Sequence, residues 1–221
     1  MSRTPRTVER DVQDQPQALS IVLDRMFGEG RMALDGARAT VLSGRPVIVT
    51  GMGASFHVAV PLVYHLSAMG VNANLIETGE LVRHRLLLCR NAVVVVISQS
   101  GQTNETVELL DAMTELNAIT IGVTNEEPGA LARRAHLPLI VGSPRDTVFA
   151  VQTYMGAMAV LLSLSGRPGL LERRFRAGVA GGAGAGVRAD GRRFPQGRWS
   201  ALCARTRPLG RLRPRCGALV S

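Results

Sequence analysis

The chain has 221 residues, a length that suits one domain of ordinary size, or one domain with a tail. Its formal net charge of +9 belongs to the C-terminal end, where residues 167–221 hold 13 arginines and two acidic residues. Residues 1–166 hold 13 arginines and 15 acidic residues, a net charge of −2, and the whole chain contains no lysine. The basic balance therefore gives no reason to expect nucleic-acid binding by the folded core.

Residues 1–45 are predicted to form a helical extension with breaks. Pro16 suits the first turn of a helix. The apolar stripe of that helix consists of Leu19, Val22, Leu23 and Met26. Gly28 and Gly30 interrupt the pattern, and a second short helix is predicted at Met32–Leu42. This extension is too short for a complete helix-turn-helix domain.

Residues 46–166 alternate between short apolar runs and helical patterns. Strands are predicted at Pro46–Thr50, Val71–Glu77, Ala92–Ile97, Ala118–Thr124 and Leu137–Val141. Helices are predicted at Phe56–Met69, Gly79–Leu88, Glu105–Leu116, Gly129–Ala135 and Val148–Leu164. Pro61 should kink the first of these helices. The order predicts an α/β fold, a three-layer sandwich around a five-stranded, parallel, doubly wound sheet.

The segment after Gly166 has a different texture. Arginine, glycine, alanine and proline dominate it, and apolar periodicity is lost. We therefore predict that residues 167–221 form a disordered tail. Arginine without lysine beside these residues is also what an out-of-frame reading of a G+C-rich gene yields, so a frameshifted tail is a further hypothesis.

The turn after the third predicted strand is rich in hydroxyl groups. It carries Ser98, Ser100, Thr103 and Thr106. Hydroxyls, a glycine that lets the backbone come close, and the unpaired N–H groups of a helix start together favour an anion, most often phosphate. One hydroxyl would suffice to cap the helix, so we interpret the turn as a phosphate or phosphosugar site. The chain lacks the G-x-x-x-x-G-K-[ST] pattern of a nucleotide P-loop.

The turn after the first predicted strand reads Gly51-Met52-Gly53-Ala54-Ser55. Ligands of doubly wound sheets lie at the carboxyl ends of strands, beside the point where strand order reverses. Ser55 should therefore face Ser98 and Ser100 across a crevice. The alternative is a nicotinamide cofactor with Glu77 as the acidic residue, but Phe56 stands where the third glycine of that fingerprint belongs. The serines of the second turn suit a monophosphate better.

Two residues are candidates for acid–base chemistry near this crevice. His57 lies just past the glycine turn, and Glu80 follows the second predicted strand. Enolisation of a ketose needs a carboxylate or an imidazole within hydrogen-bond reach. An ordinary place on the exposed side of a helix is the alternative for His57.

Other sequence features bear on the compartment. No run of 18 apolar residues occurs, and the N-terminus, Met1–Pro5, lacks the apolar core of a signal peptide. Cys89, Cys203 and Cys216 follow neither a metal spacing nor a disulfide framework. We expect a cytoplasmic protein that spans no membrane, with reduced thiols, no metal and no cofactor.

Gly51–Ser55, Ser98–Thr103 and Thr124–Asn125 together resemble the sugar isomerase (SIS) domain family. The resemblance covers residues 7–164 and is nearest to the first SIS domain of glutamine–fructose-6-phosphate aminotransferases. It implies a phosphosugar ligand. It places the phosphate on Ser98, Gln99, Ser100 and Thr103, and the sugar on Gly53, Ser55 and Val148. It also implies a homodimer, for which the helix Val148–Leu164 could be the surface.

Departures from the family pattern bear on catalysis. Arg145 and Gln152 stand where the family often has a glutamate and a lysine. In the aminotransferases the acid–base residues and the Schiff-base lysine belong to a second SIS domain and its tail, and glutamine hydrolysis needs an N-terminal cysteine where this chain has Ser2. We expect a phosphosugar-binding protein without the second, catalytic half. The alternatives are a sugar-phosphate-sensing regulator and a one-domain isomerase whose site is shared between subunits.

Overall fold

The computed structural model describes residues 7–147, 149–166 and 168–183. The description below concerns the unit Met1–Gly184. Its centre is a five-stranded sheet, β1 (Val47–Gly51), β2 (Ala73–Glu77), β3 (Val93–Ile97), β4 (Ile119–Thr124) and β5 (Leu137–Ile140). The strands are parallel and lie in the order β2-β1-β3-β4-β5. This confirms the predicted fold class and all five predicted strands.

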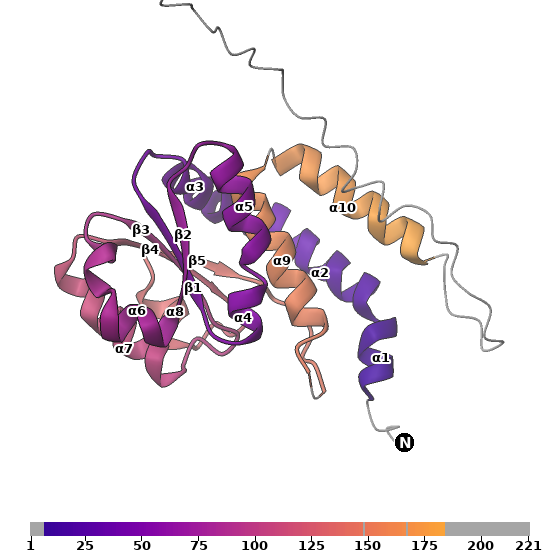
Figure 1. Cartoon of the computed structure of the whole chain (residues 1–221). Coiled ribbons are helices and arrows are strands. Elements are labelled where there is room, and N and C mark those ends of the chain that lie inside the picture. Colours follow the sequence, from indigo (N-terminus) through magenta and orange to yellow (C-terminus); the bar gives the residue numbers. More distant parts are fainter. Residues whose placement is uncertain (1–6, 148, 167, 184–221) are drawn as a thin grey trace, which may run out of the picture. The chain divides into compact units, whose positions relative to one another are not determined.

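Helices cover both faces of the sheet, as Figure 1 shows. One layer contains α2 (Gln15–Phe27), α3 (Arg31–Val41), α5 (Val60–Ala68) and α9 (Gln152–Ser165). The other contains α6 (Thr78–His84), α7 (Asn104–Ala112) and α8 (Ala130–Arg134). The shorter elements are α1 (Val8–Gln13), α4 (Ala54–His57), η1 (Leu86–Cys89) and η2 (Met113–Glu115). Because both faces are covered, every residue of β1 and β3 is buried.

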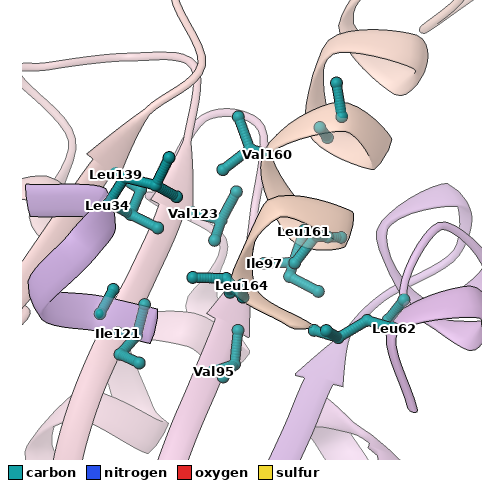
Figure 2. Packing of buried hydrophobic residues seen from close by; sticks show 14 of the residues in the cluster. Leu34, Leu62, Val95, Ile97, Ile121, Val123, Leu139, Val160, Leu161 and Leu164 are labelled. Atoms are coloured by element: carbon teal, nitrogen blue, oxygen red, sulfur yellow. The ribbon is translucent and has the colours of Figure 1, made fainter. Parts of the chain in front are cut away.

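The larger of the two apolar clusters includes residues of the N-terminal extension. Figure 2 shows Leu34 of α3 beside Leu139 of β5, with α9 residues such as Val160 packed over the sheet. The predicted apolar stripe of α2 is buried in the same cluster. The extension is therefore part of the sandwich, because its apolar face completes one helical layer.

The extents of several predicted helices were wrong; Gly79–Leu88, for example, is α6 followed by η1. The helix predicted at Phe56–Met69 with a kink is two helices, α4 and α5, and Pro61 lies in the first turn of α5. Proline is tolerated there because the first helical N–H groups have no partner within the helix. The last predicted helix begins at Gln152 instead of residue 148, because Asp146 accepts hydrogen bonds from the N–H groups of Gln152 and Thr153.

The predicted disordered tail begins too early, because residues 168–183 form α10 (Pro168–Ala183). Phe175 and Val179 pack against the core, and the Arg176 guanidinium binds Asp24 of α2 at 2.8 Å. Leu171, Phe175 and Val179 recur every four residues, a helical stripe that the arginine-rich composition concealed. The rest of the predicted tail, residues 184–221, lies outside the described residues.

The apolar character of α9 has an explanation within the chain. Its buried residues are Gln152, Thr153, Gly156, Ala157, Ala159, Val160, Leu161, Ser163, Leu164 and Ser165. They pack against α2, α3, α5 and the sheet. The apolar run that suggested a dimer surface is thus mostly used by the core. Among the described residues, no helix has the length and apolar character that crossing a membrane requires.

Candidate functional site

The carboxyl ends of the three central strands are level. Gly51 of β1 lies beside Ile97 of β3, which in turn lies beside Val123 of β4. From β1 the chain continues through α5 to β2, whereas from β3 it continues through α7, on the opposite face, to β4. Strand order therefore reverses between β1 and β3, and the two connecting turns diverge there. This is where doubly wound sheets bind ligands.

A hollow of about 330 Å³ opens at this point. Its lining consists of Met52, Ser55, Ile97, Ser98, Gln99, Ser100, Thr103, Thr106 and Glu126. The sequence prediction that Ser55 lies across a crevice from Ser98 and Ser100 matches this geometry. The volume lies at the lower end of the range for small-molecule sites, about 300–1,000 Å³. Five of its nine lining residues carry hydroxyl groups.

Local hydrogen bonds hold the hydroxyl-rich turn. Ser98 Oγ accepts from Gly101 N at 3.2 Å, and Ser100 Oγ accepts from Gln102 N at 3.3 Å. A serine oxygen that accepts from the backbone keeps its own O–H for a further partner. Both serines therefore remain able to donate a hydrogen bond to an anion in the hollow.

Gly101 is required by the shape of this turn. Its φ of +62° lies in the left-handed region, and a Cβ atom there would lie 3.0 Å from Leu131 Cβ and 3.1 Å from Thr124 Oγ1. Both the backbone conformation and the lack of space exclude a side chain. The glycine thus lets the turn pass close over α8 and bring its hydroxyls to the hollow.

The N-terminus of α7 also favours an anion in the hollow. Thr103 is its N-cap residue but makes no side-chain cap hydrogen bond, and its Oγ1 instead lies 2.6 Å from Thr106 Oγ1. The first N–H groups of a helix have no partner within the helix, and they carry the positive end of its dipole. This arrangement favours an anion at the start of α7.

Glu126 is the site residue that sequence reasoning missed. It lines the hollow from the turn after β4, and its carboxylate forms an ion pair with Arg145 Nη2, with N–O distances of 3.1 and 3.3 Å. The available signal was its position two residues beyond a buried strand, next to Thr124–Asn125. Its carboxylate would repel a phosphate, and Arg145 opposes that repulsion.

The structure does not bring the two acid–base candidates to the hollow. Glu80 is exposed and pairs with Arg85 at 3.0 Å, while Glu77 caps α6 by accepting a hydrogen bond from Glu80 N. His57 is exposed at the end of α4 and contacts Phe56 edge to face. Neither residue lines the hollow. Both remain predictions as catalytic groups, and neither has support from its position in this chain.

The remaining predicted sugar contacts differ in position. Gly53 has a φ of +53° at the start of α4 and shapes the turn between Met52 and Ser55, which line the hollow. Val148 lies outside the described residues. No group of three His, Cys, Asp or Glu residues suited to a metal occurs in the described part of the chain.

A smaller hollow of about 40 Å³ adjoins the first. The two share Ser55, Ile97 and Gln99, so they form neighbouring parts of one crevice. The rest of its lining is Ala54, Val58, Val123, Thr124, Asn125, Val141, Ala150, Thr153, Tyr154 and Ala157. This second part is more apolar than the first, and it lies between α4, α9 and the ends of the strands.

Cys89 is not part of the site. Its side chain is fully buried in the layer of α6 and α7, and burial raises the pKa of the thiol to about 11. A thiol with this pKa stays protonated at neutral pH and is a poor nucleophile. Cys89 therefore acts as a small buried hydrophobe.

Comparison with known proteins places this geometry in a family. The SIS domain model matches residues 43–165. A glutamine–fructose-6-phosphate aminotransferase (isomerizing) from Aeropyrum pernix is 30% identical over 188 residues, which cover 81% of this chain and 30% of that protein. Glutamine–fructose-6-phosphate aminotransferase (isomerizing) 1 from Arabidopsis thaliana is 24% identical over 176 residues, which cover 72% of this chain and 25% of that protein. The chain thus spans under a third of these relatives.

Solved structures share the fold at lower identity. Tagatose-6-phosphate ketose/aldose isomerase from Escherichia coli has a TM-score of 0.66 at 20% identity, covering 80% of this chain and 54% of that one. The sugar isomerase domain of the RpiR transcription factor from Sphaerobacter thermophilus has a TM-score of 0.60 at 20% identity, covering 81% of this chain and 99% of that one. The family model, which matches more than half of the chain, shows that the chain belongs to the SIS domain family.

Proposed function

We propose that this chain binds a sugar phosphate at the crevice between β1 and β3. The observation that carries the proposal is the hollow of about 330 Å³, lined by the hydroxyls of both turns. The phosphate occupies the turn of residues 98–103 and the start of α7, where hydroxyl and backbone donors are available. The sugar then extends toward Ser55 and the adjoining smaller hollow. Membership of the SIS family and the named activities of its relatives support a hexose 6-phosphate.

We further propose that the chain turns over its ligand poorly by itself. The 221 residues contain no lysine that could form a Schiff base. Glu126 is the only carboxylate among the residues that line the larger hollow, and it is engaged by Arg145. A kcat below about 1 s⁻¹ at saturating fructose 6-phosphate is expected in isomerase and aminotransferase assays.

Calorimetric titration tests the binding proposal. Fructose 6-phosphate should bind the wild-type chain, and unphosphorylated fructose should bind far more weakly. Replacing two hydroxyls of the turn, in S100A/T103A, should weaken binding about tenfold or more, because each lost hydrogen bond to a charged group is worth about 1.5–3 kcal/mol. The control S67A removes an exposed hydroxyl from α5 and should bind like the wild type. Equal heats for all three proteins, or none for the wild type, would refute the proposal.

A one-domain isomerase with a site shared between subunits is the second candidate. The observation in its favour is that the two acid–base candidates, Glu80 and His57, lie away from the hollow of their own chain. A second subunit would then have to supply the base. Turnover that rises with protein concentration together with dimer formation would support this candidate, and constant specific activity would exclude it. A sugar-sensing regulator has less support, because α2 and α3 bury their apolar faces in the core.

A further inference from the structure

The segment just before α9 is held from the other end of the chain. Asp11 of α1 is fully buried, and its Oδ2 accepts a hydrogen bond from Thr147 N at 2.7 Å. Its Oδ1 accepts from Gln152 Nε2 at 3.4 Å. Gln15 of α2 adds a bond from its Nε2 to Val151 O at 3.4 Å. A buried carboxylate is costly unless it is well hydrogen-bonded, so this contact is a specific feature of the fold.

Asp146 anchors the same segment at its other side. Its Oδ1 accepts from Gln152 N at 2.7 Å, and its Oδ2 accepts from Thr153 N at 3.0 Å and from Thr153 Oγ1 at 2.6 Å. A carboxylate that takes the first N–H groups of a helix stabilises the helix start. Asp11 thus holds residues 147 and 152, and Asp146 holds residues 152 and 153.

This stretch forms a wall of the crevice. Ala150 and Thr153 line the smaller hollow, which shares Ser55 and Gln99 with the larger one. The hydroxyl-rich turn is held by bonds between residues two or three positions apart and by bonds to residues 123–125 and 131, none of which involves Asp11 or Asp146. The two parts of the crevice therefore depend on different supports.

We propose that Asp11 is a positioning residue for the sugar end of the ligand. Asp11 binds Thr147 and Gln152, and Asp146 binds Thr153. Together, the two carboxylates position the wall formed by Ala150 and Thr153. The turn that takes the phosphate does not depend on it. The inference rests on the proposed sugar-phosphate function, and it adds that the N-terminal helix α1 determines how well the sugar, rather than the phosphate, is bound.

The test compares two probes on one set of variants. D11A should weaken fructose 6-phosphate about five- to tenfold, because the wall loses hydrogen bonds that held it in place. Inorganic phosphate, which needs only the turn of residues 98–103, should bind within about twofold of the wild type. D146A, which removes the other anchor, should give the same selective loss and keeps the test available if D11A does not fold.

Two further variants separate positioning from general damage. D11N should bind both probes like the wild type, because an amide still accepts from Thr147 N. Its NH₂ can pair with Gln152 Oε1, which has no hydrogen-bond partner among the described residues, once that amide turns over. V41A truncates a fully buried side chain at the end of α3 that leads into β1. It should lower the melting temperature without changing the ratio of the two affinities.

The outcomes are distinct. Selective weakening of fructose 6-phosphate in D11A and D146A, with recovery in D11N, supports the proposal. Equal weakening of both probes, or unchanged affinities in D11A and D146A, overturns it while the proposed function stands. A wild-type chain that binds inorganic phosphate but gains nothing from the sugar overturns this inference together with the sugar-phosphate function.

Discussion

Two segments that line the crevice, the hydroxyl-rich turn after β3 and the segment before α9, are held in place by different hydrogen bonds. Residues 98–103 have hydrogen bonds within the turn, such as Gly101 N to Ser98 Oγ at 3.2 Å, besides bonds to residues 123–125 and 131. In the segment before α9, Thr147 N donates to Asp11, which lies 136 positions away in sequence. The difference teaches that one crevice can combine a segment with its own internal hydrogen bonds and a segment that is held by a residue from a distant part of the sequence.

The comparison predicts that one segment binds the phosphate and the other contacts the sugar. The local turn carries hydroxyls and a helix start, the groups suited to phosphate. The distant segment carries Ala150 and Thr153 into a more apolar hollow, suited to the body of a small sugar. Changes to the first should affect every anion, whereas changes to the second should affect only ligands with a sugar.

The largest expected effect comes from Gly101 in the local turn. G101A should lose about 2–4 kcal/mol of stability, from a left-handed backbone and from overpacking against Leu131, and with it sugar-phosphate binding. G70A is the matched control, because Gly70 has a φ of +81° but nothing lies within 4 Å of its added Cβ. It should lose only about 1–2 kcal/mol and keep binding. Equal losses in urea unfolding would show that the close approach to α8 is unimportant.

A smaller effect is expected at Arg145, which lies just before the second segment and pairs with Glu126 of the larger hollow. R145A should change stability by under about 1 kcal/mol, because the arginine is 82% exposed. It should weaken fructose 6-phosphate about three- to fivefold at low salt by exposing the ligand to the Glu126 charge, an interaction of about 1 kcal/mol in water.

The double variant E126Q/R145A gives the control for this charge argument. Removing both charges should restore the affinity, and added salt should shrink the effect of R145A alone. If the double variant binds as weakly as R145A, or if salt makes no difference, Arg145 acts on the segment rather than on the charge of Glu126.

The smallest effect is expected far from both turns, at Cys89. Burial raises the pKa of its thiol from 9.0 to about 11, so at pH 8 iodoacetamide should not modify it in the folded C203S/C216S protein. As pH rises above 9, the Cys89 thiol ionises in the unfolded chain before it does so in the folded one. Its contribution to stability is therefore fully present below pH 9 and is lost as pH rises through about 11. Ligand should leave the modification rate unchanged. Rapid modification at pH 8 would contradict the buried position.

The sequence predicted what local pattern determines. The five strands could be found from their apolar runs, and the hydroxyl-rich turn that lines the hollow from Ser98, Ser100 and Thr103, because the signal and the structure occupy the same few residues. The resemblance to the SIS family, which the family comparison confirms, rested on the same turns. Site assignments beyond this geometry remain proposals.

The features that were missed have separate physical reasons. Asp146 caps α9 six and seven residues away, so the helix begins later than its apolar run suggests. α10 was missed because its stripe of Leu171, Phe175 and Val179 lies among arginines and glycines. Glu126 was missed because only the sheet brings the turns after β3 and β4 together, and Glu80 was chosen although α6 points it to Arg85.

A crystal structure of the chain soaked with fructose 6-phosphate tests the central claim most directly. The account predicts phosphate oxygens within about 3.2 Å of donors in residues 98–103, with the sugar directed toward Ser55. Density for the ligand at another surface, or a crevice that stays empty at saturating ligand, would contradict it.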